Sequence, residues 1–160
     1  MREAIDSALA QTWPDTQVLV VNDGSRDGGE TNRIVRSYGG RIRYIEKPNG
    51  VAHAERRYIF CWLSHDDRHL PHKTERPVDG WCELGCSEAV LYCDYRLSDA
   101  HGHPPQDVRR DHEMLVQKPL YAVLRGCVHG CSVFVPRSRR AAILLPSVRT
   151  GAQSCQKFPY

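Results

Sequence analysis

The chain has 160 residues, of which 41% are hydrophobic and 26% are charged, a balance typical of one soluble globular domain. This composition excludes a disordered tail, a collagen and a coiled coil. The net charge of +3 is unevenly distributed: residues 1–113 hold all 19 acids and 15 bases, whereas residues 114–160 hold seven bases and no acid. Such a basic segment suggests nucleic acid or an anionic surface as a partner. Few aromatic side chains lie among its arginines, so we expect no nucleic-acid binding.

Cysteine content and hydropathy bear on the compartment. The seven cysteines are odd in number and the first residues show no secretory signal pattern, so we expect a reducing cytoplasm. The densest apolar stretch, 58–63, is far shorter than the ~18–20 residues that a membrane span needs. We therefore expect a cytoplasmic protein that associates at most peripherally with the inner face of a membrane.

The apolar patterns predict alternating helices and strands. In chain order we expect a helix over 2–12, a strand over 16–22, a helix containing Thr31, Ile34, Val35 and Tyr38, strands over 42–46 and 58–63, a helix from Leu70–Pro71 that Pro77 and Gly80 interrupt, a strand over 89–95, a polar loop over 98–110 with edge pairing, a helical turn over 119–124, a strand over 132–135 and an arginine-rich helix from Pro136. Residues 18–21 are apolar without alternation, as in a strand buried on both faces of a parallel sheet. The order predicts one α/β domain over residues 1–160 with a mostly parallel central sheet, and residues 145–160 show no period.

Acidic side chains follow two of the predicted strands. Asp23 comes after the strand over 16–22, and Asp66 and Asp67 come after the strand over 58–63. In an open α/β sheet, ligands bind beyond the carboxyl ends of the strands. Adjacent carboxylates there suit Mg²⁺ or Mn²⁺, which takes one or two protein carboxylates together with substrate phosphates. The alternative is that Asp23 forms an Asx turn and that Asp66 or Asp67 caps the following helix.

An ordered set of short motifs resembles one enzyme family. The motifs are Val20-Val21-Asn22-Asp23-Gly24-Ser25, Asn49-Gly50-Val51-Ala52, Trp62-Leu63-Ser64-His65-Asp66-Asp67 with Leu70-Pro71-His72-Lys73, Val90–Tyr95, and Leu124–Cys131 with Val135-Pro136-Arg137. Over residues 2–145 the chain resembles the nucleotide-diphospho-sugar-binding region of family-two glycosyltransferases, which have the GT-A fold. The resemblance implies a Rossmann-like α/β domain that transfers a sugar, with inversion, from a nucleotide-diphosphate donor to a glycan or lipid-linked acceptor in cell-wall or polysaccharide synthesis.

The resemblance also implies roles for single residues. Asp23 matches the aspartate whose carboxylate accepts a hydrogen bond from the nucleotide base, commonly uracil. Asp66 matches the second aspartate of the DxD motif, which binds Mn²⁺ or Mg²⁺. Ser64 stands where the first aspartate of that motif usually is, and Asp67 is the extra acid that follows, so both are expected beside the nucleotide. Asn49 and Gly50 match a turn that lets the backbone approach the nucleotide.

The chain departs from the family pattern at three places. The family's central first strand is missing before Met1, and the crossover over 47–57 has only eleven residues, the lower limit for a parallel connection, as if shortened internally. The family's general base is an acid that follows the segment matched by Pro136-Arg137, yet no acid exists beyond Glu113. His129 is the candidate replacement. The alternative function is therefore a catalytically inactive fragment that retains at most nucleotide-sugar binding.

A structural zinc site is a further hypothesis. Its ligands would come from the cysteines and histidines Cys82, Cys86, Cys93, Cys127, Cys131, His65, His69 and His72. Two C-x₃-C pairs without a matched second pair are a weak zinc signal. A nucleophilic cysteine is also not favoured, because no cysteine has a recognisable histidine partner in the sequence.

Overall fold

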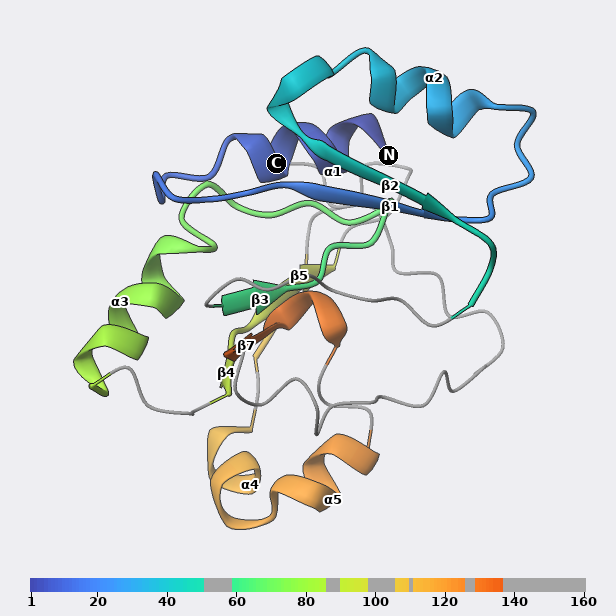
Figure 1. Ribbon diagram of the computed structural model, residues 1–160. Coiled ribbons are helices and arrows are strands. Elements are labelled where there is room, and N and C mark those ends of the chain that lie inside the picture. The colour runs from blue at the N-terminus through green and yellow to red at the C-terminus, as the bar shows by residue number, and fades with distance from the viewer. Residues whose placement is uncertain (51–58, 86–89, 98–105, 110, 126–128, 137–160) are drawn as a thin grey trace.

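The computed structural model describes residues 1–50, 59–85, 90–97, 106–109, 111–125 and 129–136 (Figure 1). Its elements, in chain order, are α1 (Arg2–Leu9), β1 (Leu19–Asp23), α2 (Glu30–Arg36), the 3₁₀ turn η1 (Gly39–Arg41), β2 (Arg43–Lys47), β3 (Ile59–Cys61), α3 (Glu75–Glu83), β4 (Leu91–Tyr92), β5 (Tyr95–Leu97), β6 (Gln106–Val108), α4 (His112–Gln117), α5 (Pro119–Leu124), the 3₁₀ turn η2 (Gly130–Ser132) and β7 (Val133–Pro136). The mixed helix and strand content agrees with the predicted α/β class. In the described segments, no helix is long and apolar enough to cross a bilayer.

Strands β1 and β2 form a parallel pair joined by α2, as the alternation predicted. Leu19 lies opposite Arg43 at one end of the pair, and Asp23 lies opposite Lys47 at the other. Helix α2 starts after Asp27, whose carboxylate accepts hydrogen bonds from the backbone N–H groups of Gly29 and Thr31 at 3.1 and 2.9 Å. These contacts satisfy donors that a helix start leaves without intrahelical partners.

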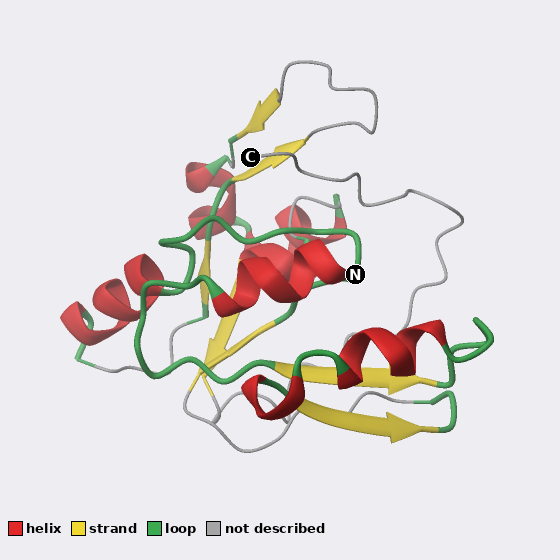
Figure 2. Cartoon of the chain, turned by 90° about the horizontal axis from the view of Figure 1, so that it is seen from above, coloured by secondary structure: helices red, strands yellow, loops and turns green. Residues whose placement is uncertain are grey.

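The other described strands pair in antiparallel fashion, so a mostly parallel central sheet is not confirmed. Strand β7 lies between β3 and β4, and β5 pairs with β6 in a separate ribbon (Figure 2). The predicted strand over 89–95 is divided into β4 and β5. The Cys93 backbone N–H, after β4, donates to the Ser132 carbonyl at 2.9 Å. The chain then pairs with β6 instead of β7. The edge pairing predicted within 98–110 is confirmed by β6.

Two other predictions are corrected. Pro77 and Gly80 do not interrupt a helix, because both lie inside α3. Pro77 is in the first turn of α3, where an N–H group has no intrahelical acceptor and a missing one costs little. The helix predicted over 2–12 ends at Leu9, and α4 was not predicted. The arginine-rich helix from Pro136 and the segment 145–160 lie outside the described residues.

The described core is small and comes from α1, α2 with the residues after it, α5 and β7. Its buried hydrophobic residues are Ala4, Ile5, Val35, Tyr38, Ala122, Phe134 and Val135. The apolar residues of β1 are only half-buried, which corrects the prediction of a strand buried on both faces. The physical reason is that β2 is the one strand bonded to β1 among the described strands.

Tyr38 joins α1 to the end of α2. It is 6% exposed, and its hydroxyl donates to Asp6 Oδ1 at 2.9 Å.

We expect Tyr38→Phe to lower the free energy of unfolding by about 1 kcal/mol, because one hydrogen bond is lost while the ring remains. Urea denaturation measures this loss. The matched control is Tyr121→Phe, at a half-exposed tyrosine, which should leave the free energy of unfolding unchanged. Equal losses in the two variants would contradict a stabilising hydrogen bond between Tyr38 and Asp6.

Candidate functional site

Asp23 ends β1 and contacts the turn that follows β2. Its Oδ1 accepts a hydrogen bond from the Gly50 N–H at 3.0 Å and forms an ion pair with Lys47. The Lys47 ammonium group also donates to the Gly50 carbonyl at 3.1 Å and to the Pro48 carbonyl at 3.3 Å. The parallel register produces this contact, because it places Asp23 and Lys47 opposite each other.

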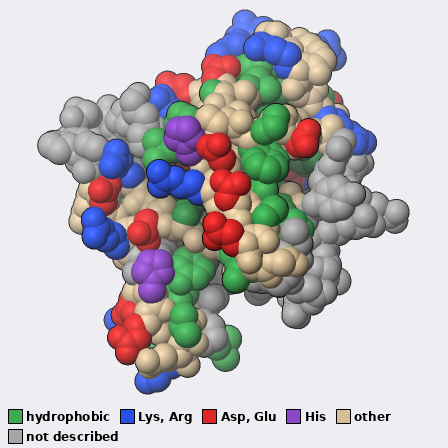
Figure 3. Space-filling model, turned by 90° about the vertical axis from the view of Figure 1, so that its left-hand side faces the viewer, with side chains coloured by type: hydrophobic (Ala, Val, Ile, Leu, Met, Phe, Trp, Pro, Cys, Tyr) green, Lys and Arg blue, Asp and Glu red, His purple; other side chains and the backbone are tan. Residues whose placement is uncertain are grey.

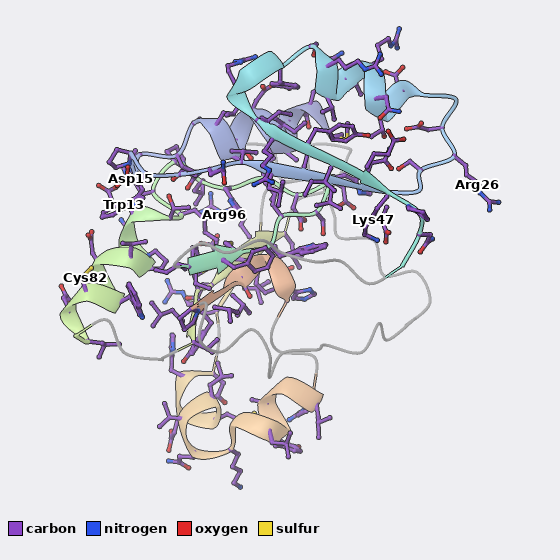
Figure 4. All side chains as sticks on the ribbon, viewed as in Figure 1. Trp13, Asp15, Arg26, Lys47, Cys82 and Arg96 are labelled. Atoms are coloured by element: carbon purple, nitrogen blue, oxygen red, sulfur yellow. The ribbon has the colours of Figure 1, made fainter. Side chains whose placement is uncertain are left out.

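The lysine keeps Asp23 charged. The hydrogen bond from Lys47 lowers the pKa of the Asp23 carboxyl, and the Gly50 N–H lowers it further. Both of these bonds go to Oδ1, and within the described residues Oδ2 has no hydrogen-bond partner. Asp23 therefore presents an exposed carboxylate oxygen that can accept one more hydrogen bond. Figure 4 shows Lys47 at the carboxyl end of β2, whereas Arg26, on the loop after β1, points away from the molecule.

The turns after β1 and β2 approach each other closely at Gly24. Gly24 has φ +77°, and a Cβ atom placed there would lie 2.9 Å from the Asn49 backbone nitrogen. Only glycine therefore allows this approach. The structure thus brings Asp23, Asn49 and Gly50 together in one cluster, which we call the β1–β2 cluster.

A network of polar side chains adjoins the β1–β2 cluster and connects it to α2. Asn22 is 5% exposed; its Oδ1 accepts a hydrogen bond from the Ser25 N–H at 2.9 Å, and its side-chain amide donates to the Tyr44 hydroxyl at 3.0 Å. The Tyr44 hydroxyl in turn donates to Asn32 on α2. Sequence reasoning did not single out Lys47, Tyr44 or Asn32. Lys47 could have been predicted from its position, because it ends the second strand of a parallel pair just as Asp23 ends the first.

The remaining candidate residues lie after β3, on a loop that α1 holds in place. Ser7 Oγ accepts a hydrogen bond from the His69 N–H at 3.1 Å. The Gln11 side chain donates to the Leu70 carbonyl at 2.9 Å and accepts from the Thr74 N–H at 3.0 Å. The position of the loop between β3 and α3 therefore depends on the polar side chains at the end of α1.

Asp66 and Asp67 lie on a tight turn of this loop, but their environments differ. The Asp67 N–H donates to the Ser64 carbonyl at 3.2 Å, which closes the turn. The Asp66 side chain is 28% exposed, and its Oδ1 lies 3.9 Å from Nδ1 of the exposed His65. Asp67 is 2% exposed, and neither of its carboxylate oxygens has a hydrogen-bond partner of ordinary geometry among the described residues.

Burial raises the pKa of the Asp67 carboxyl above its usual range, and the neighbouring Asp66 charge raises it further. The Cys131 thiol and the charged forms of His129 and His65 act in the opposite direction. A buried carboxylate without hydrogen bonds is unstable unless it binds a proton or a cation. Asp66, whose side chain is 28% exposed, could serve as a ligand of Mg²⁺ or Mn²⁺ together with phosphate and water, whereas both carboxylate oxygens of Asp67 are buried.

His129 lies beside Asp67 in a second cluster with Ser64 and Asp66, which we call the β3 cluster. Its ring packs edge-on against Tyr95 with the centroids 4.9 Å apart, and its carbonyl accepts the Ser132 N–H at 2.9 Å. The charged form of His129 lowers the pKa of the Asp67 carboxyl, against the effect of burial. The β3 cluster therefore places an imidazole next to the candidate cation site.

The zinc hypothesis gains no support from the described residues. No three His, Cys, Asp or Glu side chains there converge as metal ligands, while Cys86 and Cys127 lie outside the described part of the chain. Cys61 is not a nucleophile, because burial raises its pKa to about 12 and leaves the thiol neutral. Burial likewise lowers the pKa of the neighbouring His69 to about 4.

The close approach at Gly24 can be tested with a matched pair of glycines. We expect Gly28→Ala to cost about 1 kcal/mol of folding free energy, because Gly28 also has a positive φ but open space around it. Gly24→Ala should cost clearly more, since its Cβ meets the Asn49 backbone. Urea denaturation compares the two variants, and equal losses would mean that the two turns do not touch.

The raised pKa of Asp67 predicts a pH dependence. Because the folded state holds the proton more tightly than the unfolded state, the stability due to Asp67 is complete below the ordinary aspartate pKa and is lost as pH rises through the folded pKa. We therefore expect the stability of the parent protein, relative to Asp67→Asn, to fall as the pH rises above about 4, the ordinary aspartate pKa. Urea denaturation in EDTA measures both proteins. A difference that stays constant with pH would contradict the raised pKa, and exposed Asp79→Asn serves as the control.

Comparison with known proteins identifies the family of the chain. It is 42% identical to an uncharacterized glycosyltransferase of Rickettsia bellii over 85% of the chain and 21% of that protein, and 38% identical to one of Rickettsia prowazekii over 85% of the chain and 46% of that protein. It is 26% identical to the putative teichuronic acid biosynthesis glycosyltransferase TuaG of Bacillus subtilis, over 94% of the chain and 62% of TuaG. The chain thus spans less than half the length of these rickettsial relatives. Residues 1–138 match the sequence model of the family described as glycosyl transferase family 2, and the chain belongs to this family.

Proposed function

We propose that this chain binds a nucleotide-diphosphate sugar, with UDP as the nucleotide, and transfers the sugar with inversion to a glycan or lipid-linked acceptor. The observation that carries the proposal is the pair of acidic clusters after β1 and β3. Asp23 keeps a charged, exposed oxygen for one further hydrogen bond, and Asp67 is buried next to Asp66 with no hydrogen bond of ordinary geometry to its oxygens among the described residues. Family membership supports the reaction class.

In this proposal the β1–β2 cluster recognises the base. A carboxylate accepts hydrogen bonds only, so Asp23 selects a base with an N–H group at the position it faces, as uracil has. Lys47 fixes the carboxylate through Oδ1 and leaves Oδ2 for the base. The Gly24–Asn49 approach holds the two turns together beside Asp23.

The β3 cluster would hold the cation and the diphosphate. Asp66 would supply a hard oxygen ligand to the cation, Asp67 lies next to it, and Ser64, on the same turn, would contact the ribose directly or through a water. When bound, Mn²⁺ or Mg²⁺ neutralises the diphosphate, which makes it a better leaving group. The name of the TuaG relative refers to teichuronic acid biosynthesis, which favours a polysaccharide as the acceptor.

Proton removal from the acceptor is assigned to His129. His129 is a titratable side chain whose charged form acts on Asp67, as that of a base at this site would. A positioned base contributes about 10²- to 10⁴-fold to the rate. The second candidate function is sugar-nucleotide binding without transfer, which the packing of His129 against Tyr95 favours.

Isothermal titration of UDP with and without Mn²⁺ tests the donor site. We expect Mn²⁺ to strengthen UDP binding by about tenfold or more, since it bridges carboxylates and diphosphate. Asp66→Asn should remove the effect of Mn²⁺, and Asp23→Ala should weaken UDP binding with and without the metal. The control is Asp15→Asn, which lies at the opposite end of the β1–β2 pair from Lys47 (Figure 4).

Two results separate the candidate functions. Absence of binding by UDP, UDP-sugars and GDP-sugars would reject both of them. Binding without release of sugar from any donor would leave the non-catalytic function alone. If transfer occurs, His129→Gln should lower the rate while the affinity for UDP stays unchanged.

A further inference from the structure

The Lys47 ammonium group is fully hydrogen-bonded within the β1–β2 cluster and the turn that follows β2. It donates to Asp23 Oδ1, to the Pro48 carbonyl at 3.3 Å and to the Gly50 carbonyl at 3.1 Å. A lysine has three N–H donors, and all three are used here. The Lys47 side chain is 19% exposed, although an ammonium group usually extends into water. Lys47 is therefore a fixed part of the site.

Lys47 and Gly50 together fill one of the two oxygens of the Asp23 carboxylate. Oδ1 accepts hydrogen bonds from the ammonium group and from the Gly50 N–H, the latter at 3.0 Å, and a carboxylate oxygen has about two lone-pair sites. Oδ2 has no hydrogen-bond partner among the residues that the structure describes, and the Asp23 side chain is 42% exposed. The carboxylate therefore offers a ligand one free oxygen instead of two.

One free oxygen distinguishes two nucleobases that both present N–H groups. Uracil has one ring N–H group with a carbonyl oxygen on each side, and the positive charge of Lys47 attracts such oxygens. Guanine presents two donors side by side, its ring N1–H and its N2 amino group, which match both oxygens of a carboxylate. With Oδ1 filled, the second donor of guanine would face the Lys47 ammonium group and find no acceptor. An unpaired donor in a binding site lowers affinity.

We propose that Lys47 makes the donor site select uracil over guanine, because it keeps Oδ1 of Asp23 occupied. The inference rests on the proposed function, since it names the determinant of the base within the same site. Lys47 acts through Asp23 and is therefore a positioning residue. The parallel register supports this role, because it sets Lys47 opposite Asp23 at the carboxyl ends of β1 and β2.

Isothermal titration of UDP and of GDP at one Mn²⁺ concentration tests this proposal. We expect the parent protein to bind UDP at least about tenfold more tightly than GDP, since guanine leaves one donor unpaired. Lys47→Met keeps the length of the side chain but removes its charge and its donors. This variant should lower the UDP-to-GDP ratio of affinities by about tenfold, because Oδ1 becomes free for the second donor of guanine. A purely structural loss would weaken both nucleotides equally and leave the ratio unchanged.

The pH dependence of UDP binding gives a second readout, measured in EDTA so that no metal contributes. Lys47 is the charged group that acts on Asp23 among the described residues, and it lowers the pKa of that carboxyl together with the Gly50 N–H. The parent protein should therefore bind UDP to a pH below the usual aspartate range. In Lys47→Met the pKa of Asp23 rises, and UDP binding should be lost at a higher pH.

The matched control is Arg26→Met, which removes one positive charge from the loop after β1. Arg26 is exposed and points away from the molecule (Figure 4), so this variant should keep the affinity ratio and the pH dependence of the parent. UDP and GDP carry the same diphosphate, so diphosphate contacts cancel in the ratio. This cancellation includes contacts with the basic side chains that lie among acidic ones on the face seen in Figure 3.

The outcomes separate this proposal from the proposed function. If the parent protein binds neither UDP nor GDP, the proposed function fails and this inference fails with it. If the parent binds UDP and GDP equally well, or if folded Lys47→Met keeps the parent's ratio, only this inference is overturned. Thermal unfolding shows whether each variant is folded, and the comparison of UDP with GDP in the parent needs no variant.

Discussion

The buried carboxyl group of Asp67 is the constraint around which the candidate site is organised. It lies at the end of β3 with almost no exposure, and none of the described groups satisfies its oxygens with good geometry. A carboxylate in that position is stable only with a proton or a cation. The charges of Asp66 and His129 both act on Asp67, so one buried carboxyl group interacts with the candidate metal ligand and with the candidate base.

The rest of the site depends on how the turn that carries Asp67 is held. Its position does not come from the short strand β3 alone, because α1 binds the following loop through Ser7 and Gln11. Tyr38 in turn fixes α1 to the end of α2. Helix α1 therefore helps to position both the β1–β2 pair and the turn after β3. A substitution at a buried residue of α1 should shift the side chains of both acidic clusters.

Part of this organisation could be predicted from the sequence. Local patterns were sufficient for β1, α2 and β2, because each is a short periodic run bounded by turn residues. The turn residues Asp23, Asn49 and Gly50 were predicted as a group and lie in contact. Their family resemblance was confirmed by the match over residues 1–138.

Other features depend on residues far apart in the chain and could not be predicted. The antiparallel pairing of β3 with β7 joins segments more than seventy positions apart, and a short apolar run does not reveal its partner. Asp67 was expected beside the nucleotide or as a cap of the following helix, but its burial was not predicted, because its environment includes Cys131 and His129, over sixty positions later. Helix α4 was missed because six residues give too little periodicity, although Asp111 is an ordinary capping residue.

The central claim is that burial raises the pKa of the Asp67 carboxyl beside the proposed Mg²⁺ or Mn²⁺ site. The most direct measurement is a carboxyl ¹³C NMR titration of Asp67 in the free protein and with saturating Mg²⁺ and UDP. We predict a midpoint above the usual aspartate range in the free protein and a clear decrease when Mg²⁺ and UDP bind, because the cation stabilises the charged form. An ordinary midpoint in the free protein, or a raised one that Mg²⁺ and UDP leave unchanged, would contradict the account.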